Sequence, residues 1–182
     1  LLEHVEIRNA YQGVVIQGPT ITADPKLMIN ASIIDNCYDA GIIAVNSDVQ
    51  AINCVISNCG KNILLLQGGN YSFKHCTNVA ISNPYILHKD PVLALTDYFK
   101  DGDNVYYGDM NAEFINSIFW SENTVVENEV AEDKQGTGPF NVRFTNCLWK
   151  MKTVPADFFT SGTIENQDPL FIGTDTSYDF RL

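Results

Sequence analysis

Apolar and polar positions follow a fixed repeat along this chain. Residues 29–37 and 51–59 superpose with a shift of 22 residues and no gap, and both end in Asn-Cys. Each copy holds short apolar runs broken by Asn, Gly and Cys, without the spacing of an amphipathic helix. A constant period of about 20 to 50 residues is typical of repeat architectures. The pattern therefore predicts a parallel β-helix in which each period forms one coil.

Three vertical rows follow when further copies of the repeat are aligned. The apolar row is Ile29, Ala51, Phe73, Phe114 and Phe144, the row of small residues is Ser32, Cys54, Cys76, Ser117 and Cys147, and the corner row is Asn53, His75, Asn116 and Asn146. Like positions in neighbouring parallel strands lie about 4.8 Å apart, so we expect a continuous apolar core. We expect burial of Ile29, Ile56, Leu64, Phe73, Phe114 and Phe144. Asn tolerates positive φ, so the corner row is expected to be structural.

Two stretches interrupt the repeat. Loop insertions are expected at about residues 84–111 and 121–139, where prolines and acidic residues replace the apolar runs. Two alternative folds fit the sequence less well. A helical fold is not expected because Asn and Gly occur too often, and a β-sandwich would leave the period of 22 unexplained. Because the chain starts inside a repeat, we expect residues 1–182 to be one domain, the C-terminal fragment of a longer chain.

The last part of the chain carries more specific motifs. Residues 114–120 and 144–149 restate one pattern, and Asp-Pro-Leu-Phe at 168–171 is followed by Tyr178-Asp179-Phe180-Arg181-Leu182. Together with the coils, these motifs resemble right-handed parallel β-helix proteins of the pectate lyase-like superfamily, and particularly a largely uncharacterised bacterial surface family that ends in DPLF and then DFRL. The resemblance implies an all-β, right-handed solenoid of six or seven coils and an extracytoplasmic, cell-surface or secreted location.

The acidic composition of the chain argues against some classes of binding partner. The 182 residues carry a net charge of −11, with a pI near 4.5 and no basic stripe. Binding to nucleic acid needs clustered Lys and Arg that neutralise phosphates, so nucleic acid is not an expected partner. No apolar run reaches the length of a membrane-spanning helix. The oligomeric state is left open.

The five cysteines are Cys37, Cys54, Cys59, Cys76 and Cys147. Stacked neighbours could form disulfides, but the odd count and the Ser residues in one row favour buried free thiols. Zinc is not expected, because the chain has neither CxxC nor HxxxH spacing. His75 could be a catalytic base, but it occupies the corner row, and His4 and His88 are expected at the surface.

Carboxylates decide whether an enzyme is expected. A glycosidase needs two carboxylates held about 5 to 9 Å apart, and the regular coils hold few acids. Asp35 aligns with Arg8 and Ser57 rather than with a second acid. The residues present therefore favour a chain without an active site of its own, and no cofactor is expected apart from a candidate calcium ion.

The first insertion is the best candidate for chemistry, because it concentrates acids and aromatic residues. Tyr98, Tyr106 and Tyr107 could stack on sugar rings, and Asp101 and Asp103 could bind calcium through their oxygens. The alternative is a flap whose aromatic residues cover the flank of the coils. Long loops are usual carriers of function.

Three functions are compatible with these observations. The first hypothesis is a non-catalytic exported or cell-surface module that contacts polysaccharide. The second is a polysaccharide lyase or glycoside hydrolase whose active site lies partly outside this chain. The third is a structural stalk or adhesin. An aromatic groove would favour the first hypothesis, the polysaccharide-contacting module. Stacked acids with a Lys or Arg would favour the second, the enzyme. A polar face without such features would favour the third, the stalk or adhesin.

Overall fold

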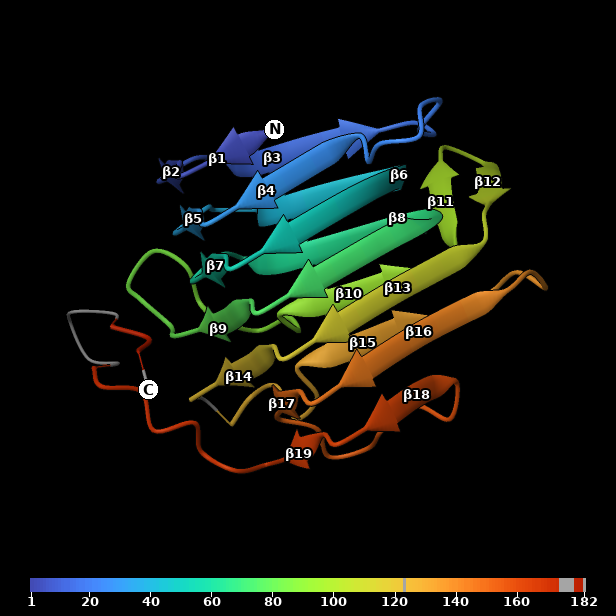
Figure 1. The fold of residues 1–182 in the computed structure, drawn as a ribbon. Coiled ribbons are helices and arrows are strands. Elements are labelled where there is room, and N and C mark those ends of the chain that lie inside the picture. Colours follow the sequence, from blue (N-terminus) through green and yellow to red (C-terminus); the bar gives the residue numbers. More distant parts are fainter. Residues whose placement is uncertain (123, 174–178, 182) are drawn as a thin grey trace.

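The computed structural model describes residues 1–122, 124–173 and 179–181, and all regular structure in these residues is β. Most strands belong to two parallel sheets, which run side by side along the molecule (Figure 1). The described part of the chain is thus all-β with long parallel sheets, as in a solenoid. No helix in the described residues is long and apolar enough to cross a membrane.

The larger sheet has ten strands. Its main path is β1 (Leu2–Glu3), β4 (Leu27–Asn30), β6 (Ala40–Ile52), β8 (Lys61–Lys74), β13 (Met110–Ile115), β16 (Phe140–Thr145) and β18 (Phe158–Ser161), and off this path lie β3 (Gln12–Gln17), β10 (Leu93–Thr96) and β15 (Val130–Asp133). Strand β6 turns a corner at Asn46, where φ is 46°, and β8 turns at Gln67, where φ is 59°, and the register between the two strands shifts there. Each of these strands therefore contributes to two faces of the molecule.

The smaller sheets complete the fold. The seven-stranded sheet consists of β2 (Glu6–Arg8), β5 (Ile33–Asp35), β7 (Val55–Ser57), β9 (Thr77–Ala80), β14 (Ile118–Ser121), β17 (Leu148–Trp149) and β19 (Ile164–Glu165). The remaining pair, β11 (Tyr98–Asp101) and β12 (Asn104–Tyr107), forms an antiparallel hairpin. The hairpin projects beyond the corner at which β6 and β8 bend (Figure 1).

The predicted apolar row is confirmed by the strand register. Ile29 pairs with Ala51, Ala51 with Phe73, Phe73 with Phe114, and Phe114 with Phe144. All five side chains are buried, and the ring of Phe114 stacks 5.5 Å from Phe73 and 4.7 Å from Phe144. Such stacks add to the free energy gained by burial of apolar area. The row is the continuous core that the repeat predicts.

One predicted core residue is wrong. Ile56 is buried as expected, but Leu64 is only half-buried. Successive side chains of a strand point to opposite sides, and in β8 the fully buried neighbours are Ile63 and Leu65. Leu64 therefore points away from the core.

The corners are built by residues with positive φ. Asn53, His75, Asn116 and Asn146 have φ between 50° and 54°, in the left-handed region that Asn adopts more readily than most residues. A second row, Asn9, Asn36 and Asn58, has φ between 52° and 57° and marks the next corner of each repeat. Along this second row, the Asn36 Nδ2 donates to Asn9 Oδ1 over 2.6 Å.

Both expected insertions contain a strand of the larger sheet. In β10, Leu93 pairs in parallel with Ile63 of β8 and with Val130 of β15. The expectation of loop insertions at about residues 84–111 and 121–139 is therefore wrong for β10 and β15. The connections that flank β10 and β15 differ in length from the connections in the regular repeats. The fixed period of 22 residues therefore does not reveal these two strands.

The closing motif is described in part. Residues 168–171 and 179–181 are described, whereas Tyr178 and Leu182 lie outside the described residues. The two described parts pack together, with ring centroids of Phe171 and Phe180 5.4 Å apart and a backbone hydrogen bond of 3.0 Å from Ile172 to Arg181. The two described parts of the closing motif therefore contact each other directly.

All five cysteines are buried free thiols. The backbone N–H of Cys37 points at the Sγ of Cys59 over 3.4 Å, which places these two thiols in neighbouring coils as the spacing predicts. Burial raises the pKa of Cys147 to about 11, so this thiol is protonated at neutral pH.

The core row predicts the effect of truncating its central ring. Phe114→Ala should lower the free energy of unfolding by about 3 to 5 kcal/mol, because the cavity lies between two stacked rings. Urea denaturation measures the loss. The matched control Phe159→Ala removes a ring that is 54% exposed and should cost less than about 1 kcal/mol. Equal losses for the two variants would contradict the register.

The thiols predict a redox state. Alkylation under denaturing, non-reducing conditions should label all five cysteines, because each thiol is packed as a small apolar side chain. Mass spectrometry of the alkylated chain measures the number of labels. Three labels or fewer would show at least one disulfide and would overturn the prediction.

Candidate functional site

The three tyrosines singled out in the sequence lie on the β11–β12 hairpin, but not on one surface. Tyr98 pairs with Tyr107, and Phe99 pairs with Tyr106. Directly opposed residues of an antiparallel pair point to the same side, and successive pairs alternate. Tyr98 and Tyr107 therefore share one side of the hairpin, and Tyr106 lies on the other side with Phe99.

Each side of the hairpin borders a different cavity. Tyr107 lines a cavity of about 460 Å³ together with Asp97, Asp109 and the glycine-containing segment 135–138. On that side the hydroxyl of Tyr98 donates to Asp133 Oδ2 over 2.5 Å. This hydrogen bond to a carboxylate raises the pKa of Tyr98 and ties the hairpin to the end of β15.

The other side of the hairpin faces the corner of the larger sheet. Phe99, Asp101 and Tyr106 line a cavity of about 280 Å³ with Asn46 and Gln67, the corner residues of β6 and β8. Tyr106 is 47% exposed and leaves part of its ring accessible. Tyr106 therefore presents an accessible aromatic ring beside the corner at which β6 and β8 bend.

The predicted calcium ligands lie at the tip of the hairpin. Gly102, with φ of 59°, and Asp103 form the two-residue turn between Asp101 and Asn104. Both aspartates are exposed. In the described residues, no group of three His, Cys, Asp or Glu side chains converges in a way that could hold a metal ion. A cation here would need backbone or amide oxygens as further ligands.

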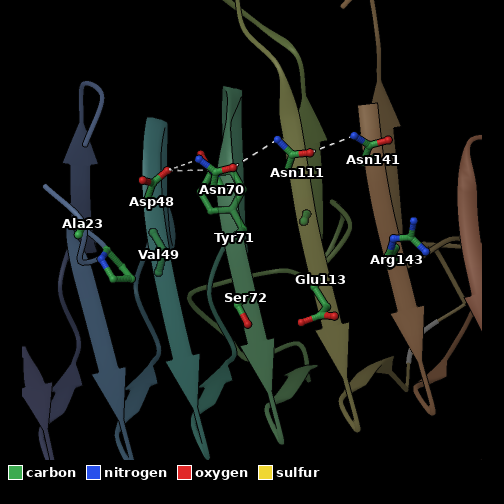
Figure 2. Close-up of a pocket in the computed structure, with 12 residues that line it drawn as sticks. Ala23, Asp48, Val49, Asn70, Tyr71, Ser72, Asn111, Glu113, Asn141 and Arg143 are labelled. Carbon is green, nitrogen blue, oxygen red and sulfur yellow. Dashed lines mark hydrogen bonds between the residues drawn. The ribbon is translucent and has the colours of Figure 1, made fainter. Parts of the chain in front are cut away.

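A second candidate site lies on the outer face of β6, β8, β13 and β16 (Figure 2). A cavity of about 450 Å³ runs over this face, and Ala23 and Pro25 lie at its edge. Its most regular feature is a row of polar side chains, one from each strand: Asp48, Asn70, Asn111 and Asn141. The period of the repeat places these residues one above another.

Hydrogen bonds join the row from strand to strand. Asn70 Nδ2 donates to Asp48 Oδ1 over 2.8 Å, Asn111 Nδ2 to Asn70 Oδ1 over 3.3 Å, and Asn141 Nδ2 to Asn111 Oδ1 over 3.0 Å. An amide has two donors and two acceptor lone pairs, so this ladder uses only part of the capacity of each Asn. The three Asn side chains are exposed and present the remaining donors and acceptors to solvent.

A second outer row lies two residues further along the same strands. It contains Ser72, Glu113 and Arg143, and Glu113 is the register partner of Arg143. Glu113 also lies 3.6 Å from the Lys74 ammonium, and the Arg143 guanidinium lies over the ring of Phe159 at 4.9 Å. The groove therefore has charged groups of both signs, held by neighbouring side chains.

The acids of this groove are far apart. Asp48 and Glu113 lie two strands and two residues apart, which corresponds to roughly 12 Å. Paired carboxylates of glycosidases lie about 5 to 9.5 Å apart. The strand positions of Asp48 and Glu113 are therefore farther apart than the paired carboxylates of a glycosidase.

The sequence predicts His88 at the surface, and this prediction is wrong. His88 is instead buried against Glu129, and its Nε2 lies 3.0 Å from both carboxylate oxygens. Glu129 also accepts hydrogen bonds from the Ser121 hydroxyl and, over 3.2 Å, from the backbone N–H of Val92. Sequence spacing gives no sign of this pair, because 41 residues separate His88 from Glu129.

The buried cluster is arranged as a structural link. Glu129 Oε1 is the shared partner of the Ser121 hydroxyl and of His88 Nε2, so one carboxylate oxygen joins the two side chains. Lys150 Nζ adds a hydrogen bond of 3.2 Å to the Ser121 hydroxyl. The cluster thus joins the last residue of β14 to the segments that precede β10 and β15.

The chain was compared with protein-family models, with curated proteins and with solved structures, and none of them matches it.

The buried pair predicts a large loss on removal of one partner. His88→Ala should lower the free energy of unfolding by about 3 kcal/mol or more, because it leaves the Glu129 carboxylate buried without its imidazole partner. Chemical denaturation measures this loss. The neighbouring exposed residue gives a control, Lys89→Ala, which should change stability by less than about 0.5 kcal/mol. A loss for His88→Ala as small as that of the control would contradict the link.

Proposed function

We propose that this chain is a non-catalytic module of an exported or cell-surface protein, and that it binds polysaccharide along the outer groove of β6, β8, β13 and β16. The observation that carries the proposal is the ladder from Asp48 to Asn141 beside a cavity of about 450 Å³. The ladder repeats the same hydrogen-bonding groups at every strand. A polymer that presents hydroxyl groups at regular intervals is the ligand that such a surface suits.

The groove contains the kinds of group that hydroxyls need. The amides of Asn70, Asn111 and Asn141 keep spare donors and acceptors, the Arg143 guanidinium donates, and Glu113 accepts. Hydrogen bonds to charged groups contribute about 1.5 to 3 kcal/mol, more than bonds between neutral groups. Arg143 and Glu113 are therefore expected to dominate affinity, and the ladder to set the direction of the bound chain.

The hairpin extends the same surface. Asn46 and Gln67 border the cavity beside Tyr106, and Asp48 and Asn70 begin the groove two and three residues later. A saccharide that lies in the groove would reach the ring of Tyr106 at this end. Tyr98 and Tyr107 face the other side of the hairpin, so we assign them no contact with the same bound chain.

We also propose a finer assignment of the fold. The parallel sheets and the rows of corner Asn residues support a right-handed β-helix of six or seven coils, of the kind found in the pectate lyase-like superfamily. The closing motif supports the resemblance to the bacterial surface family, and with it an extracytoplasmic location.

Binding is tested with a glycan array, followed by calorimetry on the glycans that bind. Arg143→Ala should weaken binding about tenfold or more, the effect of losing one charged hydrogen bond. Asn111→Ala should weaken it less, because only one member of the ladder is lost. The matched control is Asn30→Ala, which removes another amide bonded to a neighbouring coil, through Glu3 at 3.1 Å, but lies outside the cavity.

Two outcomes would contradict the proposal. If Arg143→Ala and Asn111→Ala bind as tightly as Asn30→Ala, the groove is not the binding site. Release of products from a bound glycan would show catalysis and would favour the lyase or hydrolase alternative.

A further inference from the structure

A second aromatic surface lies at the corner that follows β2 and β5. Tyr11 and Tyr38 occupy equivalent positions in two repeats, each two residues after a corner Asn, and their rings stack with centroids 5.8 Å apart and an interplanar angle of 27°. They are 67% and 62% exposed. The spacing of the repeats holds these two large rings in a stack that is open to solvent.

In the third repeat the same position is Gly60. Its N–H donates to Cys37 O over 3.0 Å, as the N–H of Tyr38 donates to Ala10 O over 2.9 Å. A Cβ at Gly60 would lie 2.4 Å from Tyr38 O, so the backbone here approaches too closely for any side chain. The tyrosine row therefore stops at Gly60, and space remains where a third ring would lie.

That space is a cavity of about 320 Å³. Tyr38 and Gly60 line it on the side of the coils, and Tyr85 and Leu87 line it from the segment that leads to β10. Tyr85 is 83% exposed, so this second wall also has an accessible ring. The cavity is thus lined by the ring of Tyr38 on one side and by the side chains of Tyr85 and Leu87 on the other.

The polar groups around the cavity carry no net charge. They are two acids, Asp39 and Asp90, and two lysines, Lys61 and Lys89. Lys61 Nζ lies 3.5 Å from Asp90 Oδ2, so the site presents donors and acceptors together. A phosphorylated or otherwise strongly anionic ligand would meet both acids, and a cationic ligand would meet both lysines. The chemistry suits a neutral ring that bears hydroxyl groups.

We propose that this corner is a second carbohydrate site, in which a neutral pyranose ring stacks on Tyr38 as the third member of the row. Its apolar face packs on the tyrosine, and its hydroxyls bond to Lys61 and Asp90. This inference deepens the proposed function, on which it rests for the ligand class, but it uses no residue of the outer groove. Two sites on one chain would raise the apparent affinity for a long polymer above that of either site.

The test uses the intact chain and four neutral hexasaccharides, built from glucose with α and β linkages, from mannose and from xylose. Backbone amide NMR spectra follow each titration. With at least one hexasaccharide, the amide signals of Gly60 and Lys61 should shift. Tyr38→Ala should weaken this binding about five- to tenfold. Tyr38→Phe, which keeps the ring, should stay within about twofold, and Tyr107→Ala, which removes a tyrosine elsewhere, should have no effect.

The outcomes separate this site from the groove. Shifts at Gly60 that survive Arg143→Ala but not Tyr38→Ala support the second site, whatever the groove does. If glycans bind and only the groove variants weaken them, the second site is overturned and the proposed function stands. If no hexasaccharide shifts Gly60 or Lys61, or if Tyr38→Ala binds like the wild type, the second site is overturned.

Discussion

In-register stacking of parallel strands is the constraint on which the rest of this structure depends. Neighbouring parallel strands lie about 4.8 Å apart, so every side chain lies over its equivalent in the next repeat. Inside, this alignment stacks Phe73, Phe114 and Phe144 into a core. At the corners it favours residues that accept positive φ, and outside it joins Asn side chains into a hydrogen-bonded ladder. A single register thus accounts for the core, the corners and the outer surface.

The same constraint explains where the candidate binding surfaces arise. Where every repeat places a similar polar residue in a row, the result is a continuous polar surface, as on the outer face. Where a large residue in a row is followed by a small one, space is left beside it. The change from Tyr38 to Gly60 is of this second kind, and a cavity lies beside it. Segments that leave the coils then complete each surface: the hairpin with Tyr106 at one corner, and the segment with Tyr85 at another.

The sequence predicted the parts of the structure that recur in aligned repeats, including the two repeats that follow the insertions. The apolar row and the buried cysteines could be read directly from aligned repeats. Strands β10 and β15 could not, because connections of unequal length shift them out of the period of 22. The outer ladder has the same offsets of 22, 41 and 30 residues as the row from Ala51 to Phe144, so the alignment brings its members into one row. The alignment alone does not show that this row is exposed or that its amides bond to one another. The His88–Glu129 pair has no periodic signal at all, since it joins two irregular segments.

Cross-linking across the first insertion tests the register most directly. Asn70 and Asn111 are paired on the outer face although 41 residues separate them. Paired positions in parallel strands lie within the range of Cα separations that a disulfide spans. With both residues changed to Cys, mild oxidation should give one disulfide between positions 70 and 111, identified by peptide mass spectrometry. The double variant Asn70→Cys with Ala112→Cys should give none, because Ala112 points into the core. No 70–111 disulfide, or equal cross-linking in both variants, would contradict the stacked register.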